Sequence, residues 1–143
     1  MSLEYKTLVV WQRADDLFID LHRLTYQQFP RDEQFELGRQ IRRAAYSVPA
    51  NIVEGFARQH GRDRINFFNI ASASLSELTY GLHAAHRLGY LDDESYWALD
   101  DRTRMVAAPL NGLIRSTRAR TVAGAAIKLT AFALAAVQLF NWL

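Results

Sequence analysis

Apolar residues recur along this chain in alternating steps of three and four positions, and this spacing constrains the fold more than any other feature. It is the period of an α-helix that buries one face. No segment competes with the two-residue alternation of a β-strand. Four segments show the helical spacing, at Val10, Ala14, Leu17, Leu21 and Leu24; at Leu37, Ile41, Ala45, Val48, Ile52 and Phe56; at Phe68, Ala71, Leu75, Leu78, Leu82 and Ala85; and at Tyr96, Leu99, Thr103, Val106, Leu110, Leu113 and Thr117.

Proline, glycine and aspartate mark the ends of these four predicted helices. Gly89 is expected to cap the third helix, since glycine readily adopts the left-handed conformation that ends many helices. Short connections between long helices predict an antiparallel up-down four-helix bundle, so the fold class is all-α. With 143 residues, half of them hydrophobic, one bundle domain over residues 1–120 is expected. The helices are predicted to stop near Phe29-Pro30, to span residues 33–58, to run from behind His60-Gly61 to Leu88-Gly89, and to start behind Asp92 or Asp93 as N-cap.

Residues 121–143 form an apolar C-terminal tail, in which 17 of 23 residues are Ala, Val, Ile, Leu, Phe or Trp. Leu129, Phe132 and Ala136 keep the helical spacing, which predicts an extra helix packed on the bundle or on a neighbouring subunit. A basic flank before the tail is typical of a membrane anchor. Against an anchor, Lys128 would cost about 2.5–3.5 kcal/mol at the bilayer centre, and fewer residues follow it than the ~20 needed to span. A non-native extension is the third alternative.

Charge is segregated along the chain although the net charge is only +2. Residues 37–64 hold six arginines against two acids, residues 77–101 hold six acids against one arginine, and residues 102–128 hold six cations and no acid. Fifteen of the seventeen cations are arginine, the side chain suited to bidentate phosphate contacts. A GC-rich genome would produce the same bias, so the composition alone does not locate a phosphate site.

Two prolines interrupt the helical stripes. Pro49 and Pro109 each lack the amide that would bond the carbonyl four residues earlier, at Ala45 and Met105. We expect a kink at each proline, and a donor from elsewhere for the freed carbonyls.

Polar residues near the first proline predict a structural network. Asn51 lies between core positions, Glu54 can pair with Arg58 one turn later, and Glu77 offers a second carboxylate to Arg42 or Arg43. Buried polar groups in bundles usually fix helix register, so a structural role is preferred to a catalytic one. The expected network comprises Pro49, Asn51, Glu54 and Glu77.

Sequence motifs of enzymes and metal sites are missing from the chain. No Glu stands three residues before a His, as di-iron bundles require, and His83 with His86 would supply only two ligands. There is no phosphate loop, no nucleophile elbow and no cysteine. We therefore predict no enzyme activity, no metal and no cofactor. Without a signal-peptide pattern at the N-terminus, a cytoplasmic location is expected.

Five motifs follow one another along the chain: Phe29-Pro30-Arg31-Asp32-Glu33, Leu37-Gly38-Arg39-Gln40-Ile41-Arg42-Arg43-Ala44-Ala45, Ser47-Val48-Pro49-Ala50-Asn51-Ile52-Val53-Glu54-Gly55 with Arg58, Ala73-Ser74-Leu75-Ser76-Glu77-Leu78, and Leu88-Gly89-Tyr90-Leu91. Together they resemble the four-helix-bundle proteins encoded by 23S ribosomal RNA intervening sequences. The resemblance covers about residues 5–118, and it implies a small bacterial bundle that forms a homopentameric ring without known enzyme activity. The accessory variability proteins of diversity-generating retroelements are more distantly similar; they are basic pentamers that bind nucleic acid and a reverse transcriptase, whereas this chain is only mildly basic.

The leading function hypothesis is a non-enzymatic, ring-forming binding or scaffolding protein whose arginines contact RNA or DNA phosphates. A ring would multiply a modest charge by its symmetry. The alternative for these arginines is pairing with the acids of residues 77–101. Two rival functions stay open: a membrane-associated oligomer anchored by the tail, and an enzyme whose inter-subunit site would join Glu54, Glu77 and His83. The candidate phosphate contacts are Arg39, Arg43, Arg58, Arg62 and Arg64.

Overall fold

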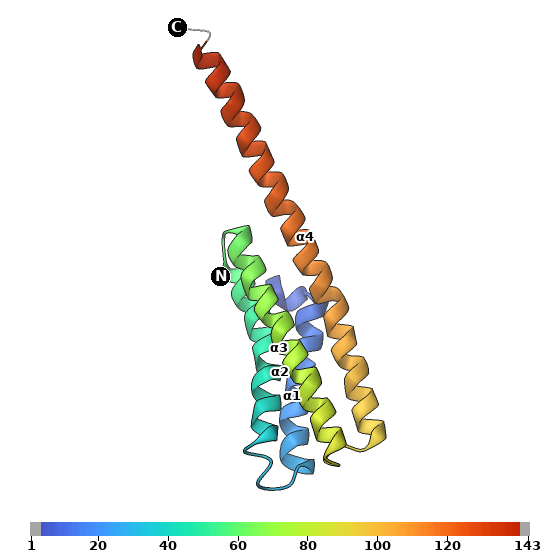
Figure 1. Ribbon diagram of the computed structural model, residues 1–143. Coiled ribbons are helices and arrows are strands. Elements are labelled where there is room, and N and C mark those ends of the chain that lie inside the picture. The colour runs from blue at the N-terminus through green and yellow to red at the C-terminus, as the bar shows by residue number, and fades with distance from the viewer. Residues whose placement is uncertain (1–3, 141–143) are drawn as a thin grey trace.

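The structure is a computed structural model that describes residues 4–140, with side chains described as far as residue 132. It confirms the all-α, antiparallel up-down four-helix bundle (Figure 1). No strand occurs within the described residues. The elements are a short 3-10 helix η1 (Glu4–Thr7), then α1 (Val9–Gln28), α2 (Leu37–Ala57), α3 (Gly61–Arg87) and α4 (Asp93–Phe140).

The predicted apolar stripes meet in one core along the bundle axis. Leu21 of α1, Ile52 of α2 and Leu78 of α3 are fully enclosed, and Leu110 of α4 is 1% exposed. Burying an aliphatic side chain of this size contributes about 1.5–3 kcal/mol, so the four stripes together hold the helices in register. The core therefore explains why the three-four spacing predicts the fold.

Glycine allows α2 and α3 to approach closely at two points. A Cβ atom on Gly81 would lie 2.9 Å from Cγ1 of Ile41, and one on Gly55 would lie 2.5 Å from Cε1 of Phe68. The neighbour of Gly55 is the Phe68 ring of α3. That ring is 1% exposed, so it has little room to move.

The connection from α1 to α2 differs from the prediction. Helix α2 begins at Leu37 and not at Glu33, because residues 31–36 form turns. The side-chain amide of Gln34 donates to the carbonyls of Tyr26 (3.1 Å) and Phe29 (3.0 Å). Carbonyls at the end of a helix lack partners within that helix, and these turns supply donors at the end of α1.

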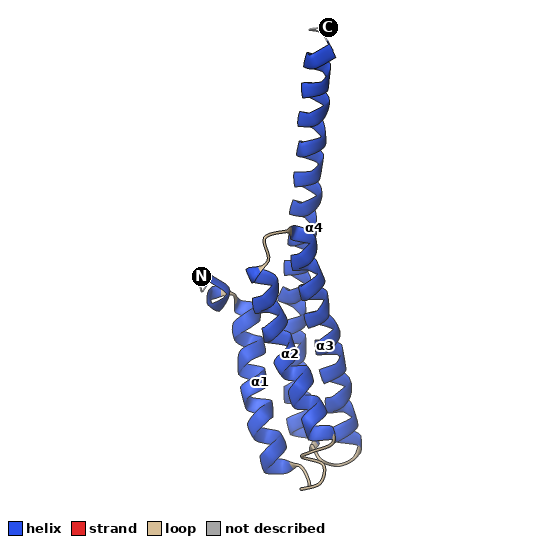
Figure 2. Ribbon diagram, turned by 90° about the vertical axis from the view of Figure 1, so that its left-hand side faces the viewer, coloured by secondary structure: helices blue, strands red, loops and turns tan. Residues whose placement is uncertain are grey.

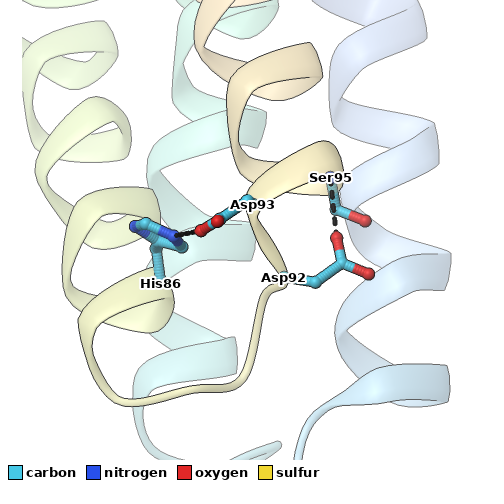
Figure 3. A network of polar contacts seen from close by, with 4 residues as sticks. All are labelled: His86, Asp92, Asp93 and Ser95. Atoms are coloured by element: carbon cyan, nitrogen blue, oxygen red, sulfur yellow. Dashed lines mark hydrogen bonds and ion pairs between the residues drawn. The ribbon is translucent and has the colours of Figure 1, made fainter.

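The connection from α3 to α4 follows the prediction closely (Figure 3). Gly89 has a φ of 79°, and the amides of Gly89 and Tyr90 donate to His86 and Ala85 carbonyls, the bonding pattern of a Schellman cap. Asp92 is the N-cap of α4: its Oδ1 accepts from the amide of Ser95 at 2.7 Å. These hydrogen bonds from Ser95 lower the pKa of the Asp92 carboxyl.

Helix α4 is a single helix of 48 residues, and its C-terminal half projects beyond the bundle (Figures 1 and 2). The expected extra helix is therefore a continuation of α4. Thr121 lies against the turn at Gly61, whereas the side chains described beyond it are exposed and do not pack on the bundle of the same chain. No proline interrupts residues 121–140, and their alanines and leucines favour helix, so nothing ends α4 at residue 120. Packing against a neighbouring subunit stays a prediction. Within the described residues, no helix has the length and apolarity to cross a membrane.

Candidate nucleic-acid interface

The five predicted phosphate contacts lie in two separate groups. Arg39 and Arg43 stand in the first turns of α2, whereas Arg58, Arg62 and Arg64 surround the turn between α2 and α3. At 1.5 Å per residue, Arg43 and Arg58 are roughly 22 Å apart along the axis of α2. The structure therefore does not bring the five arginines into one patch.

The first group lies beside an acid. Arg43 is exposed and lines a hollow of about 200 Å³ together with Glu77. A carboxylate in the same hollow lowers the positive potential that a phosphate would meet. The expected ion pair from Glu77 to Arg42 or Arg43 is not among the contacts of the described residues.

Arg42 serves the fold. Its guanidinium donates to Oγ1 of Thr25 at 2.9 Å and to the carbonyl of Gln34 at 2.7 Å, and it lies 4.2 Å from the centre of the Tyr26 ring. Only 9% of the residue is exposed. Arg42 thus joins α1, the following turn and α2 from within, and it is not available to a ligand.

In the second group, two of the three arginines hold the turn between α2 and α3. Arg58 pairs with Glu54, as predicted from their spacing, and lies 4.7 Å from the centre of the Phe67 ring. Nε of Arg64 donates to the carbonyl of Arg58 at 2.7 Å, which satisfies a carbonyl where α2 ends. Arg62 is exposed.

A groove of about 660 Å³ lies between this turn and α4, and we call it the basic groove. Its cations are Arg62 and Arg64 from the start of α3 and Arg120 and Lys128 from α4, and none of its described lining residues is acidic. Gly61 brings the turn against α4, since a Cβ there would lie 2.0 Å from Oγ1 of Thr121. Figure 2 shows the loop before α3 beside α4.

Arg120 and Lys128 were missed as candidates because Arg120 was interpreted as part of the basic flank of the tail and Lys128 as part of the tail itself. Their proximity to Arg62 depends on α4 passing beside the turn between α2 and α3, and this tertiary arrangement leaves no local pattern in the sequence. The available signal was the absence of acids after Asp101. An acid-free stretch on one helix makes any groove beside it positive.

The expected polar network exists in part and has different members. Nδ2 of Asn51 donates to the carbonyl of Ser47 at 2.7 Å, and the hydroxyls of Ser47 and Ser74 are 2.8 Å apart, which joins α2 to α3. Pro49 is buried nearby without a polar contact of its own, while Glu54 and Glu77 lie outside this network at the surface. The two serines were missed because serine in a helix usually faces solvent.

The three residues of the enzyme hypothesis do not converge within this chain. Glu54 lines a groove between α1 and α2, Glu77 lines the hollow between α2 and α3, and His83 is exposed on α3. Nε2 of His86 lies 2.6 Å from Oδ1 of Asp93 at the turn into α4 (Figure 3). The His86 ring also stacks on the Tyr96 ring, with 4.3 Å between the ring centres. In the described part of the chain, no three His, Asp or Glu residues gather as metal ligands.

Comparison with known proteins finds a matching family and similar solved structures. A family model described as the 23S rRNA-intervening sequence protein matches residues 6–112. A crystal structure of a protein of unknown function from the S23 ribosomal protein family of Bacteroides thetaiotaomicron is 26% identical, with a TM-score of 0.69. That match covers 74% of this chain and 98% of the other. No curated protein matches. Neither match names a catalytic activity.

Proposed function

The chain belongs to the family of 23S rRNA-intervening sequence proteins, and we propose that it is a non-enzymatic, self-assembling module that binds the phosphate backbone of a nucleic acid in its basic groove. The proposal combines two parts. One is a phosphate-binding surface, which is argued from the groove. The other is self-association, which the resemblance to ring-forming bundles led us to expect and which the exposed apolar surface supports.

The single observation that carries the phosphate-binding part is the composition of the basic groove. Three guanidinium groups and one ammonium group line one open groove, with no carboxylate among the described lining residues. Guanidinium groups match phosphate geometry, and cations gathered in a concave surface reinforce one another. Neither Arg62 nor Arg120 makes an ion pair among the described residues, so both are free to meet a ligand.

Single-stranded nucleic acid fits this groove better than a rigid duplex. The groove is bounded by a helix turn on one side and by α4 on the other, so its four cations line a concave surface of the kind that follows the backbone of a single strand. Backbone contacts of this kind read charge and not sequence. We therefore expect comparable affinity for single-stranded RNA and DNA.

Self-association has its own support on the surface of the bundle. Tyr26 and Tyr46 are 44% and 59% exposed, and Phe132 on the projecting part of α4 is 76% exposed. Large apolar side chains that gather at a surface mark contacts between proteins. In a ring, the basic grooves would be repeated by symmetry, which raises the potential that a long nucleic acid meets.

The test is the fluorescence anisotropy of labelled single-stranded RNA and DNA. Replacing Arg62 and Arg120 by alanine removes two charged groove donors, so we expect affinity to fall about tenfold or more. The matched control replaces Arg23 and Arg87, two exposed arginines away from the groove, and should change affinity by less than about twofold.

Light scattering on the same samples measures self-association separately. Absence of binding by the unmodified protein, or an equal loss in both double variants, would contradict the phosphate-binding part. A particle mass equal to the single-chain 16.4 kDa would contradict the assembly part.

A further inference from the structure

The projecting part of α4 presents a surface that its own bundle does not cover. Val122 and Leu129 are 65% and 71% exposed, and both lie beyond the residues that the family model matches. Arg115 and Arg118 are also exposed. The steps from 115 to 118 to 122, and two further turns to 129, keep the three-four spacing, so these four residues share one face of the helix. We call this surface the outer face: Arg115, Arg118, Val122 and Leu129.

The outer face is distinct from the face that lines the basic groove. Thr117, Thr121, Gly124 and Lys128 line the basic groove. At 100° per residue, the outer face is turned away from these four by roughly a third of a circle. A partner on the outer face therefore leaves the phosphate-binding residues open.

A helix with mostly apolar residues on every side is normally enclosed by other protein. The bundle of the same chain does not enclose the projecting part of α4, because this helix leads away from the bundle (Figures 1 and 2). A fitting surface exists elsewhere on the molecule, between α1 and α2.

There an apolar groove of about 380 Å³ is lined by the rings of Trp11, Phe18 and Tyr46, with the carboxylates of Asp15 and Glu54 beside them. We call it the aromatic groove. Phe18 and Tyr46 meet edge to face at 5.5 Å, and the aromatic surface continues along α1 through His22, which packs on Phe18 and Tyr26 at 5.9 and 5.3 Å.

The two surfaces are complementary in charge. The aromatic groove presents Asp15 and Glu54 beside aromatic rings, of which Glu54 also pairs with Arg58 of its own chain, and the outer face presents two arginines followed by two aliphatic side chains. Arginine suits this groove, because its guanidinium group pairs with carboxylates and also stacks on aromatic rings. No acid follows Asp101 in the sequence, so nothing on the outer face would repel Asp15 and Glu54.

The two surfaces also agree in length. From Trp11 to Tyr26 the aromatic surface of α1 extends over about 22 Å, and from Arg115 to Leu129 the outer face extends over about 21 Å, both at 1.5 Å per residue. A helix can therefore lie along the whole surface. Arg115 and Arg118 then lie beside the carboxylates near the start of α1 while Leu129 lies beside Tyr26. Because α4 is antiparallel to α1 within one chain, the second copy is inverted relative to the first, so the contact joins two copies, or two rings, head to head.

We propose that the outer face of α4 of one molecule packs in the aromatic groove of a second copy of this chain, with Arg115 and Arg118 facing Asp15 and Glu54. This contact rests on the self-association in the proposed function and names the two surfaces that meet. A lipid surface is the less fitting occupant of the outer face, since Lys128 would lie within the buried length and ionised groups in a bilayer are costly.

Cross-linking tests the contact directly, because the chain has no cysteine that could interfere. One protein carries Ala50→Cys in the aromatic groove and a second carries Val122→Cys on the outer face; they are mixed and treated with a short bis-maleimide. We expect a cross-linked dimer that contains one of each. The control pairs Ala50→Cys with Gly124→Cys, which lines the basic groove about 160° around the helix from Val122 and has room for a side chain, and should yield little product.

Charge reversal supplies the second measurement. Arg115→Glu with Arg118→Glu should weaken self-association at least about tenfold in sedimentation experiments, and adding Asp15→Lys with Glu54→Lys should restore it. Circular dichroism verifies that each variant is folded. RNA binding in the intact basic groove is measured in parallel, so loss of this contact and loss of the proposed nucleic-acid binding give different results.

Three results would overturn the proposal. Cross-linking of Val122→Cys only to itself would show that the projecting helices pair with each other. Flotation of the unmodified protein with phosphatidylserine vesicles, together with loss of the mixed cross-link, would show that lipid covers the outer face. Unchanged association after charge reversal would show that these charges take no part.

Discussion

Gly55 occupies the closest approach between α2 and α3, and a single methyl group there tests how tightly the core is packed. In Gly55→Ala, the new Cβ would lie 2.5 Å from the enclosed Phe68 ring, and that ring is held among core residues. Overpacking of this kind costs about 1–3 kcal/mol. We expect urea denaturation to show a free energy of unfolding lower by that amount.

Gly112→Ala is the matched control, since Gly112 also lies in a helix but has no atom within 4 Å of the position of an added Cβ. Alanine there should raise the free energy of unfolding by up to about 1 kcal/mol through helix propensity. If both substitutions change stability equally, the close packing of α2 against α3 is not what excludes a side chain at Gly55.

At the scale of the helix, α4 tolerates a proline because another helix supplies the missing donor. Pro109 leaves the Met105 carbonyl without its amide partner, and a guanidinium nitrogen of Arg13 in α1 donates to that carbonyl at 2.9 Å. We predict that Arg13→Ala lowers the free energy of unfolding by about 0.5–1.5 kcal/mol. In Pro109→Ala, the restored amide should make the loss of Arg13 nearly neutral. Thermal unfolding of the four proteins in this double-mutant cycle measures the coupling, and additive effects would contradict the compensation.

The start of α4 carries a pH-dependent contribution to stability. Hydrogen bonds from Ser95 lower the pKa of Asp92 below its ordinary value of 3.8. A carboxyl with a lowered pKa in the folded state stabilises the protein above its unfolded-state pKa, and this contribution is lost as pH falls through the folded-state pKa. We expect Asp92→Ala to lower the melting temperature at pH 7, and the difference from the unmodified protein to shrink below pH 3.8. A difference independent of pH would mean that the charge of Asp92 does not contribute.

At the scale of the whole molecule, the sequence was sufficient for the bundle because the determinants of the bundle are local. Each of the four stripes predicted between residues 10 and 117 became a core face, and Gly89 and Asp92 end and begin helices as their backbone preferences require. The start of α2 was misplaced by one turn because the hydrogen bonds of Gln34 with α1 are formed between elements and leave no periodic pattern.

The candidate site was less predictable because it depends on which elements come together. Arg42 has the same local sequence signal as Arg43, yet the structure encloses one and exposes the other. Arg120 and Lys128 became groove residues only because α4 continues unbroken beside the turn at Gly61. Charge segregation indicated that a basic surface exists, whereas its members required the tertiary structure.

The central claim, that the basic groove binds phosphates, is tested most directly by the salt dependence of binding to single-stranded RNA. Each phosphate contact to a single strand contributes about −0.7 to the slope of the logarithm of the association constant against the logarithm of the salt concentration. The four cations of one groove should therefore give a slope of roughly −3. For Arg62→Ala with Arg120→Ala, the slope should be shallower by about 1.4. A slope near zero, or one that the two substitutions leave unchanged, would contradict the claim.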